Sequence, residues 1–213
     1  MEVLKEKKKF RVFALLEHVV ELSNGSLHGY LVGTKFMLGN AELSYKDLFD
    51  KQIKDRAESM VIDYVIKSRK EKRLFIRVSR EKDIDYLKIE ASSNLVVCLS
   101  VATKLDSLAK TITSIKRSGM KCAICDYSTI GYELKEFRMG SFDYVFFRDD
   151  FYAYAKRNEL KKLIDTMKFF KILVGFRNID SGEKLNQAIS LGVDLGHGYL
   201  FGSEMVPVGI IEA

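Results

Sequence analysis

The sequence predicts an α/β fold, a closed TIM-like (β/α)8 barrel that opens with an antiparallel hairpin, and three observations lead to this prediction. Apolar runs typical of strands recur about eight times along the chain, as a barrel of this kind requires. Helical stretches separate most of these runs, which favours parallel strands with right-handed crossovers. The turn between the first two runs is too short for a parallel crossover, so these two strands should pair antiparallel. An open doubly wound sheet is the competing architecture.

The opening hairpin is predicted from two stretches rich in β-branched and aromatic residues, at 11–20 and 27–36. The Asn24-Gly25 pair between them is typical of a tight turn. A helical period follows, from Ser44 as a suitable N-cap residue to Arg69. Apolar residues recur along one side of this helix, and charged residues occupy the other side.

Strands and helices then alternate to the end of the chain. The remaining strands are predicted at residues 74–78, 95–101, 121–126, 142–147, 169–174 and 194–201. The remaining helices are predicted at residues 83–91, 105–117, 132–137, 150–168 and 181–191. Gly119 should end one of these helices, and Ser181 should cap another. No strand is followed by a Gly-x-Gly-x-x-Gly turn, which weakens the dinucleotide-binding form of the open sheet.

Composition and charge restrict the classes of function. With 213 residues, of which 47% are hydrophobic and 30% charged, the chain is most simply one globular domain spanning 1–213. The net charge of +6 permits an anionic partner, but the basic residues are dispersed, so a nucleic-acid partner is not expected. We see neither a signal peptide nor an apolar run of the roughly 20 residues that a bilayer requires. A cytoplasmic location without a membrane partner is therefore expected.

The three cysteines, Cys98, Cys122 and Cys125, suit a reducing compartment. Cys122-Ala-Ile-Cys125 has CxxC spacing, but it lies in a predicted strand, where residues three apart face opposite sides. Redox activity and zinc binding are not expected, because no second pair of cysteines or histidines completes a zinc site. No cofactor is predicted.

Several short motifs occur in an order and spacing that match a known family. The stretch Gly192-Val-Asp-Leu-Gly-His-Gly-Tyr-Leu-Phe201 resembles Gly-x-Asp-x-x-Gln-Gly-Tyr-x-Phe. Cys125-Asp-Tyr-Ser-Thr129 resembles Asp-Asp-Phe-Gly-Thr, and Asp143-Tyr-Val-Phe146 resembles Asp-Tyr-Leu-Lys. Leu31-Val-Gly33 stands where a Glu-Ala-Leu signature would be. Together they resemble the EAL domain, the bacterial module that hydrolyses cyclic-di-GMP with metal-activated water. The resemblance implies an EAL-type barrel.

The resemblance also implies which positions would carry the chemistry, and almost none holds the expected residue. In the family these positions hold glutamates, an asparagine, an aspartate pair, a lysine and a glutamine. In this chain they hold Leu31, Arg77, Cys98, Cys125 with Asp126, Phe146, Arg177 with Asp180, and His197. Only Asp126 remains a carboxylate among the expected metal ligands, and one carboxylate cannot assemble a two-metal centre. A degenerate, catalytically inactive relative without a metal is predicted.

The residues at these vestigial positions allow more than one interpretation. Arg77 and Arg177 could hold a phosphate at the barrel mouth, or they could pair with Asp126 and Asp180 and replace the metal charge, which is the favoured interpretation. Asp126 could equally cap a loop. A packed polar role is expected for His197 rather than a role as a base, and Cys98 and Cys125 are expected to be small apolar fillers at neighbouring strand ends.

The leading hypothesis is a regulatory protein that acts through a protein partner in cyclic-di-GMP-related signalling, because inactive members of the resembled family bind other proteins. The helices 44–69 and 150–168 are its candidate contact faces. The alternative is a sensor that binds cyclic-di-GMP or another nucleotide without cleaving it, although Glu17 would place negative charge near the ligand phosphates. A hydrolase with a different nucleophile is the third hypothesis. By analogy with EAL domains, a homodimer is also considered.

Overall fold

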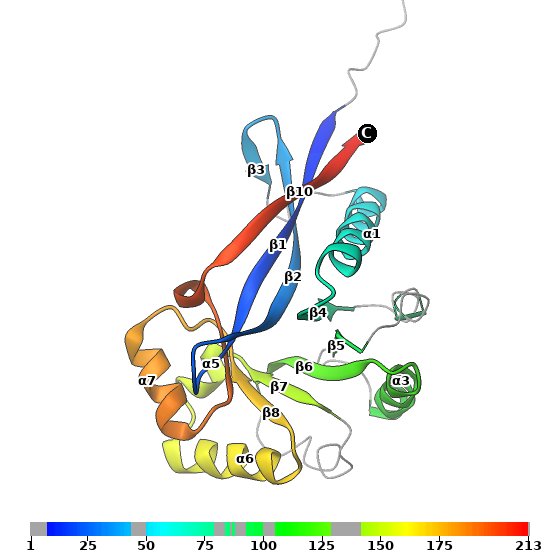
Figure 1. The fold of residues 1–213 in the computed structure, drawn as a ribbon. Coiled ribbons are helices and arrows are strands. Elements are labelled where there is room, and N and C mark those ends of the chain that lie inside the picture. The colour runs from blue at the N-terminus through cyan, green and yellow to red at the C-terminus, as the bar shows by residue number, and fades with distance from the viewer. Residues whose placement is uncertain are drawn as a thin grey trace, which may run out of the picture.

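The computed structural model describes residues 8–43, 50–78, 84–85, 87, 93–99, 105–128 and 142–212. Eight strands close into a barrel in the order β1-β9-β8-β7-β6-β5-β4-β2, and pairing of β2 with β1 completes the ring. Helices cover the outside of the barrel (Figure 1). Of the pairings between these eight strands, those of β1 with β2 and with β9 are antiparallel and the others are parallel. The predicted barrel and its antiparallel opening hairpin are confirmed.

After the three opening strands, strands and helices follow one another along most of the chain. The strands are β1 (Lys9–Glu21), β2 (Leu27–Leu38), β3 (Ala41–Leu43), β4 (Arg73–Arg77), β5 (Leu95–Leu99), β6 (Lys121–Tyr127), β7 (Tyr144–Phe147), β8 (Leu173–Phe176), β9 (Leu195–His197) and β10 (Ser203–Glu212). The helices are α1 (Lys51–Ser68), α3 (Leu105–Arg117), α5 (Asp149–Tyr152), α6 (Arg157–Phe169), α7 (Gly182–Leu191) and the 3-10 helix η1 (Tyr199–Phe201). No helix in the described ranges is long and apolar enough to cross a bilayer.

Several predicted boundaries are wrong, for reasons of local capping in one case and of tertiary packing in another. Helix α1 begins at Lys51, where the Asp50 carboxylate accepts hydrogen bonds from the backbone N–H groups of Gln52 and Ile53; the predicted cap, Ser44, lies outside the described residues. The predicted helix 150–168 is two helices, α5 and α6. The chain turns between them so that Tyr152 stacks on Phe176 of the barrel, with ring centroids 4.1 Å apart.

The strands near the C-terminus also differ from the prediction. Strand β8 begins at Leu173, because Phe169 still belongs to α6 and Lys171 adopts a left-handed turn conformation. The last predicted strand ends at His197 and continues as η1, and the sequence pattern does not predict β10 at all. Of the predicted helix 83–91, residues 84, 85 and 87 are described and helical, while 132–137 lies outside the described residues.

The core has two layers because side chains on barrel strands alternate between inside and outside. The outer layer, between barrel and helices, holds residues such as Leu74 and Ile76 of β4. Phe75, between them in sequence, points into the barrel. The barrel interior is filled by Val19, Leu31, Phe75, Val96, Cys98, Ala123, Cys125, Tyr144, Phe146 and Leu195. The barrel is thus packed along its axis with apolar side chains.

Two motif aspartates have the same structural role, each just before a barrel strand. Asp143, just before β7, accepts a hydrogen bond from the backbone N–H of Cys122 at 2.9 Å. Asp194, just before β9, accepts one from the backbone N–H of Val174 at 3.0 Å. A lysine from a covering helix lies close to each carboxylate, 2.8 Å away in the pair of Lys168 with Asp194. These aspartates therefore align strands rather than form part of a site.

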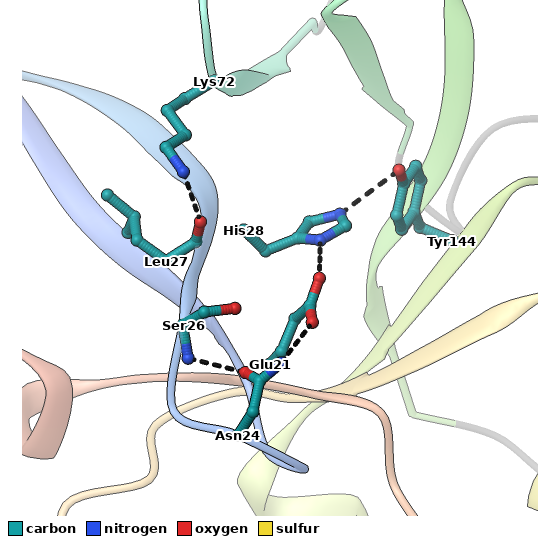
Figure 2. A network of polar contacts seen from close by, with 7 residues as sticks. All are labelled: Glu21, Asn24, Ser26, Leu27, His28, Lys72 and Tyr144. Carbon is teal, nitrogen blue, oxygen red and sulfur yellow. Dashed lines mark hydrogen bonds and ion pairs between the residues drawn. The ribbon is translucent and has the colours of Figure 1, made fainter.

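A small polar network fixes the opening hairpin at the amino end of the parallel strands (Figure 2). His28 donates from Nδ1 to Glu21 at 3.0 Å, and its Nε2 lies 3.4 Å from the hydroxyl of Tyr144 on β7. Asn24 in the turn donates to the other Glu21 oxygen at 3.3 Å. The hydrogen bond from His28 lowers the pKa of Glu21. This network closes the end of the barrel opposite the predicted site.

Beyond the barrel, β1 and β2 continue into an arm, the antiparallel sheet β10-β1-β2-β3. The C-terminal end of β10 lies at its far tip (Figure 1). Helix α1 packs against one face of the arm and buries Ile53, Ala57 and Val61 there. Glu204 of β10 fastens the base of the arm, because it accepts a hydrogen bond from Arg69, at the end of α1, at 2.8 Å. The opposite face of the arm carries no helix in the described part of the chain.

Candidate functional site

The predicted site positions gather at the rim formed by the carboxyl ends of the parallel strands, where barrels place their chemistry. Arg77 ends β4 and is paired in register with Cys98 of β5. Phe146 lies on β7 beside Gly175 of β8, and Arg177 follows β8 directly. His197 ends β9.

A small apolar pocket lies at this rim, with a cavity volume of about 10 Å³, which is close to the least that one water molecule needs. It is lined by Val19, Leu31, Phe75, Cys125, Phe146, Arg177 and His197. Of the predicted positions, Leu31, Cys125, Phe146, Arg177 and His197 therefore meet in one place. Arg77, Cys98, Asp126 and Asp180 do not line the pocket.

The side chains at this rim do not fit the divalent metals that the resemblance implies. Leu31 and Phe146, 7% and 3% exposed, have no donor atom, although Mg²⁺ and Mn²⁺ need several oxygen ligands. The Phe146 ring packs edge-on against Phe75 at 5.4 Å and covers Gly175, where even a Cβ atom would overlap it. Within the described ranges, no group of three or more His, Cys, Asp or Glu side chains could hold a metal ion.

Cys98 and Cys125 form a disulfide between the neighbouring strands β5 and β6, with their Cα atoms 5.6 Å apart. The sequence places them at neighbouring strand ends but predicts only apolar fillers there, so this part of the prediction is wrong. Both are buried, at 2% and 4% exposure. Cys122 faces the outer layer, as the strand alternation predicts, and burial raises the pKa of its thiol.

The main side-chain hydrogen bond of the rim joins Glu17 and His197. His197 is 3% exposed, and its Nε2 donates to the Glu17 carboxylate at 3.1 Å. This hydrogen bond lowers the pKa of Glu17; burial opposes the effect, and the charges of His197, Arg177 and Arg77 reinforce it. The other ring nitrogen of His197, Nδ1, is buried without a hydrogen-bond partner in the described part of the chain.

The favoured interpretation of the arginines, pairing with Asp126 and Asp180, requires correction for Asp180 only, because the charge of Asp126 does act on Arg177. Arg177 donates from a terminal guanidinium nitrogen to the backbone carbonyl of Cys125 at 2.8 Å. Among the described residues, the Asp180 carboxylate pairs with Lys184 at 3.0 Å, because the two lie one helical turn apart. Burial and the nearby charge of Arg77 lower the pKa of Arg177 to about 10, while Glu17 and Asp126 oppose this. The guanidinium stays charged at neutral pH.

Comparison with known proteins finds similarity in structure but not in sequence. No protein-family model and no curated protein matches the sequence. An EAL domain protein from Listeria monocytogenes EGD-e superposes with a TM-score of 0.71 at 17% identity, covering 92% of this chain and 89% of that one. The FimX EAL domain from Pseudomonas aeruginosa, bound to c-di-GMP, superposes with a TM-score of 0.71 at 16% identity over 92% and 90% of the two chains.

The chain has the fold of an EAL domain. Bacillus subtilis YkuI, a protein with an EAL domain solved with c-di-GMP and calcium, superposes with a TM-score of 0.76 at 12% identity over 94% of this chain. The present chain spans 56% of the YkuI chain, so YkuI has further segments that the comparison does not cover. At these identities the likeness establishes the fold alone, and the rim chemistry must be judged from the residues of this chain.

Within this EAL-like barrel, Glu17 is the site residue whose role the sequence does not reveal. From the sequence, a glutamate at this position indicates negative charge near the rim, but it does not indicate a hydrogen bond with His197. Strand β1 runs antiparallel to its neighbours, so Glu17 lies opposite Leu31 of β2 and Val19 lies opposite His197 of β9. Counting the hairpin register from the turn could have indicated this position. The bulge between Val19 and Val20 shifts that count by one residue.

The Glu17–His197 pair should make stability depend on pH on the acid side. The folded state lowers the pKa of Glu17 from 4.5, so its contribution is present above about pH 4.5 and is lost as pH falls through the lowered value. Glu17→Gln should therefore flatten the dependence of the unfolding midpoint on pH below pH 4.5, measured by thermal unfolding. Glu183→Gln, at the exposed first turn of α7, is the matched control. Equal acid profiles for wild type and Glu17→Gln would contradict the assignment.

Proposed function

We propose that this chain is a non-hydrolysing EAL-like regulatory domain that acts by binding another protein in cyclic-di-GMP-related signalling. The observation that carries the proposal is the lining of the rim pocket, where Leu31, Phe75 and Phe146 present apolar side chains that have no metal-binding atom. Metal-assisted hydrolysis needs several carboxylates to hold the ions that activate water. The positively charged Arg177 in the same pocket would repel such ions.

Hydrolysis by another nucleophile finds little support in the same pocket. Glu17 and His197 form a carboxylate–histidine pair, which is two members of a catalytic triad. Among the described residues that line the pocket, none offers the third member, a free hydroxyl or thiol beside the histidine. Cys125 is the one lining residue with sulfur, and it is engaged in the disulfide with Cys98.

Turnover of cyclic-di-GMP tests the proposal directly. Purified protein incubated with cyclic-di-GMP and Mg²⁺ or Mn²⁺ should form no more linear dinucleotide than a protein-free control over many hours. The assay should be repeated after reduction of the disulfide, so that a blocked cysteine does not hide activity. Metal-dependent turnover that disappears with a chelator would contradict the proposal.

A cyclic-di-GMP sensor is the second candidate, and the cations of the rim favour it. Guanidinium groups bind phosphates well, and Arg77 and Arg177 lie near enough to each other at the mouth for their charges to interact. Several solved structures of similar fold contain c-di-GMP. The apolar pocket and the Glu17 carboxylate disfavour a dinucleotide with two phosphates. Calorimetry decides: a Kd of about 1 μM would support the sensor, and no heat at about 1 mM ligand would remove it.

The outward faces of α1 and of the α5–α6 segment stay predictions as contact surfaces, as do a homodimer and a cytoplasmic location. The apolar side of α1 is already used against the arm, so its free side is the charged one. On α6, Lys161 pairs with Asp165 and Lys156 with Glu159, which neutralises much of its exposed charge. A surface that combines exposed apolar side chains with positive charge is found instead on the arm, on the face opposite α1.

A further inference from the structure

The arm has an apolar face that is not covered by α1. Along β1, Val12 and Ala14 are buried beneath α1, while Phe13 and Leu15 alternate with them and lie on the opposite side. Met205 and Ile210 of β10 are 53% and 57% exposed. We call Phe13, Leu15, Met37, Met205, Pro207 and Ile210 the open arm face; the strand register places them together. Contiguous exposed apolar patches of this kind mark interaction sites.

The open arm face continues without interruption into the rim of the barrel. Glu17 and Leu31 are the next positions on the same side of β1 and β2. Leu15 lies opposite Gly33, and the pairing of Val32 with Ile76 places Arg77 beside that glycine. The open arm face and the rim therefore form one continuous surface.

The charges along this surface are predominantly positive. Lys35 is neutralised by Glu42, and Lys9 by Glu212 at 3.1 Å. In contrast, Arg11 donates to a backbone carbonyl, and neither Arg77 nor Arg177 forms an ion pair with any residue in the described ranges. The charges of Glu17, Asp126 and Asp149 reach Arg177 and offset part of its charge. The Glu17 carboxylate near them is already engaged by His197.

We propose that the open arm face and the adjoining rim bind an acidic, amphipathic segment of a partner protein. Its apolar side chains would lie against Met205 and Ile210, and its carboxylates would face Arg77 and Arg177. This inference rests on the proposed function and specifies its surface and partner chemistry. A second copy of the chain suits the surface less well, because it would bring the same guanidiniums together and each copy carries a net charge of +6.

Selection from a random peptide display library tests the inference even while the partner is unidentified. Peptides selected on the wild-type protein should be rich in Asp and Glu spaced among large apolar residues. Met205→Glu with Ile210→Glu should weaken their binding at least about tenfold in fluorescence anisotropy, because the new charges would be buried beside carboxylates. Arg77→Ala should weaken binding as well, and added salt should reduce the affinity.

The matched control places the same charges on exposed side chains outside the open arm face. Ile189 of α7 and Tyr154 are 51% and 88% exposed, and Ile189→Glu with Tyr154→Glu should leave peptide binding within about twofold of wild type. Circular dichroism and thermal midpoints of all variants establish that each one folds. Arg77→Ala lies outside the arm, so it tests the surface even if the β10 variant is unstable.

Several outcomes would overturn the inference. Selection of basic peptides, or of none, would refute the stated partner chemistry. Peptides that bind the Met205→Glu, Ile210→Glu variant as well as wild type would place the contact elsewhere, while leaving the proposed interaction function intact. A dimer that this variant dissociates in sedimentation would assign the open arm face to a second copy. Failure of the proposed function itself would be seen separately, as cyclic-di-GMP turnover.

Discussion

Phe75→Ala should lower the free energy of unfolding by about 3–5 kcal/mol, the usual cost of removing a large buried aromatic side chain. Phe75 is fully buried inside the barrel, edge-on to Phe146 at 5.4 Å and to Tyr144 at 5.1 Å. These two rings lie on β7 and Phe75 on β4, so the cavity left behind cannot close by a local shift. Urea unfolding followed by circular dichroism measures the change.

The control for this substitution is Phe169→Ala at the end of α6. Phe169 is 81% exposed, so its removal should change the free energy of unfolding by less than about 0.5 kcal/mol. A loss below about 1 kcal/mol for Phe75→Ala would contradict a tightly packed barrel interior. Phe75→Ala also enlarges the pocket. If this variant binds cyclic-di-GMP and the wild type does not, the aromatic side chains in the barrel are what prevents the ligand from binding.

Reduction of the Cys98–Cys125 disulfide should also destabilise the fold strongly. Loop-closure entropy for a sequence separation of 27 residues predicts a loss of about 3.5 kcal/mol. Urea unfolding with and without a phosphine reductant measures this difference, with Cys98→Ala, Cys125→Ala as the variant in which the reductant should have no effect.

Thiol titration provides an independent check on the same bond. Of the three cysteines, Cys122 alone is free in the structure, so denatured protein should release one thiol before reduction and three after it. Cys122→Ala should release none before reduction. Three thiols in unreduced, freshly purified protein would contradict the pairing. They would agree with the reducing compartment that the cysteine content suggests.

Local features of the chain were predictable from sequence because their causes are local. The Asn24-Gly25 turn joins an antiparallel hairpin, with Gly25 at a positive φ of 73°. Ser181 caps α7 by accepting a hydrogen bond from the backbone N–H of Lys184, and Gly119 ends α3 at a φ of 77°. Each involves residues within a few positions of one another. The motif order was sufficient to predict the EAL-type barrel.

Other features depended on contacts between distant segments. The hydrophobic pattern of residues 150–168 fits one helix, and only packing of Tyr152 against β8 divides it. Strand β10 lacks the alternation of polar and apolar residues that predicts a strand, because apolar side chains also lie on its exposed face.

The sequence by itself determined most of the order of strands and helices and the barrel, because these follow from residue type, short-range spacing and motif order. Only the tertiary structure decided that Glu17 pairs with His197, that Cys98 pairs with Cys125, and that the arm leaves an apolar face open beside Arg77 and Arg177. The physical reason is that strand register and direction, including the reversed β1 and its bulge, bring together residues far apart in the chain.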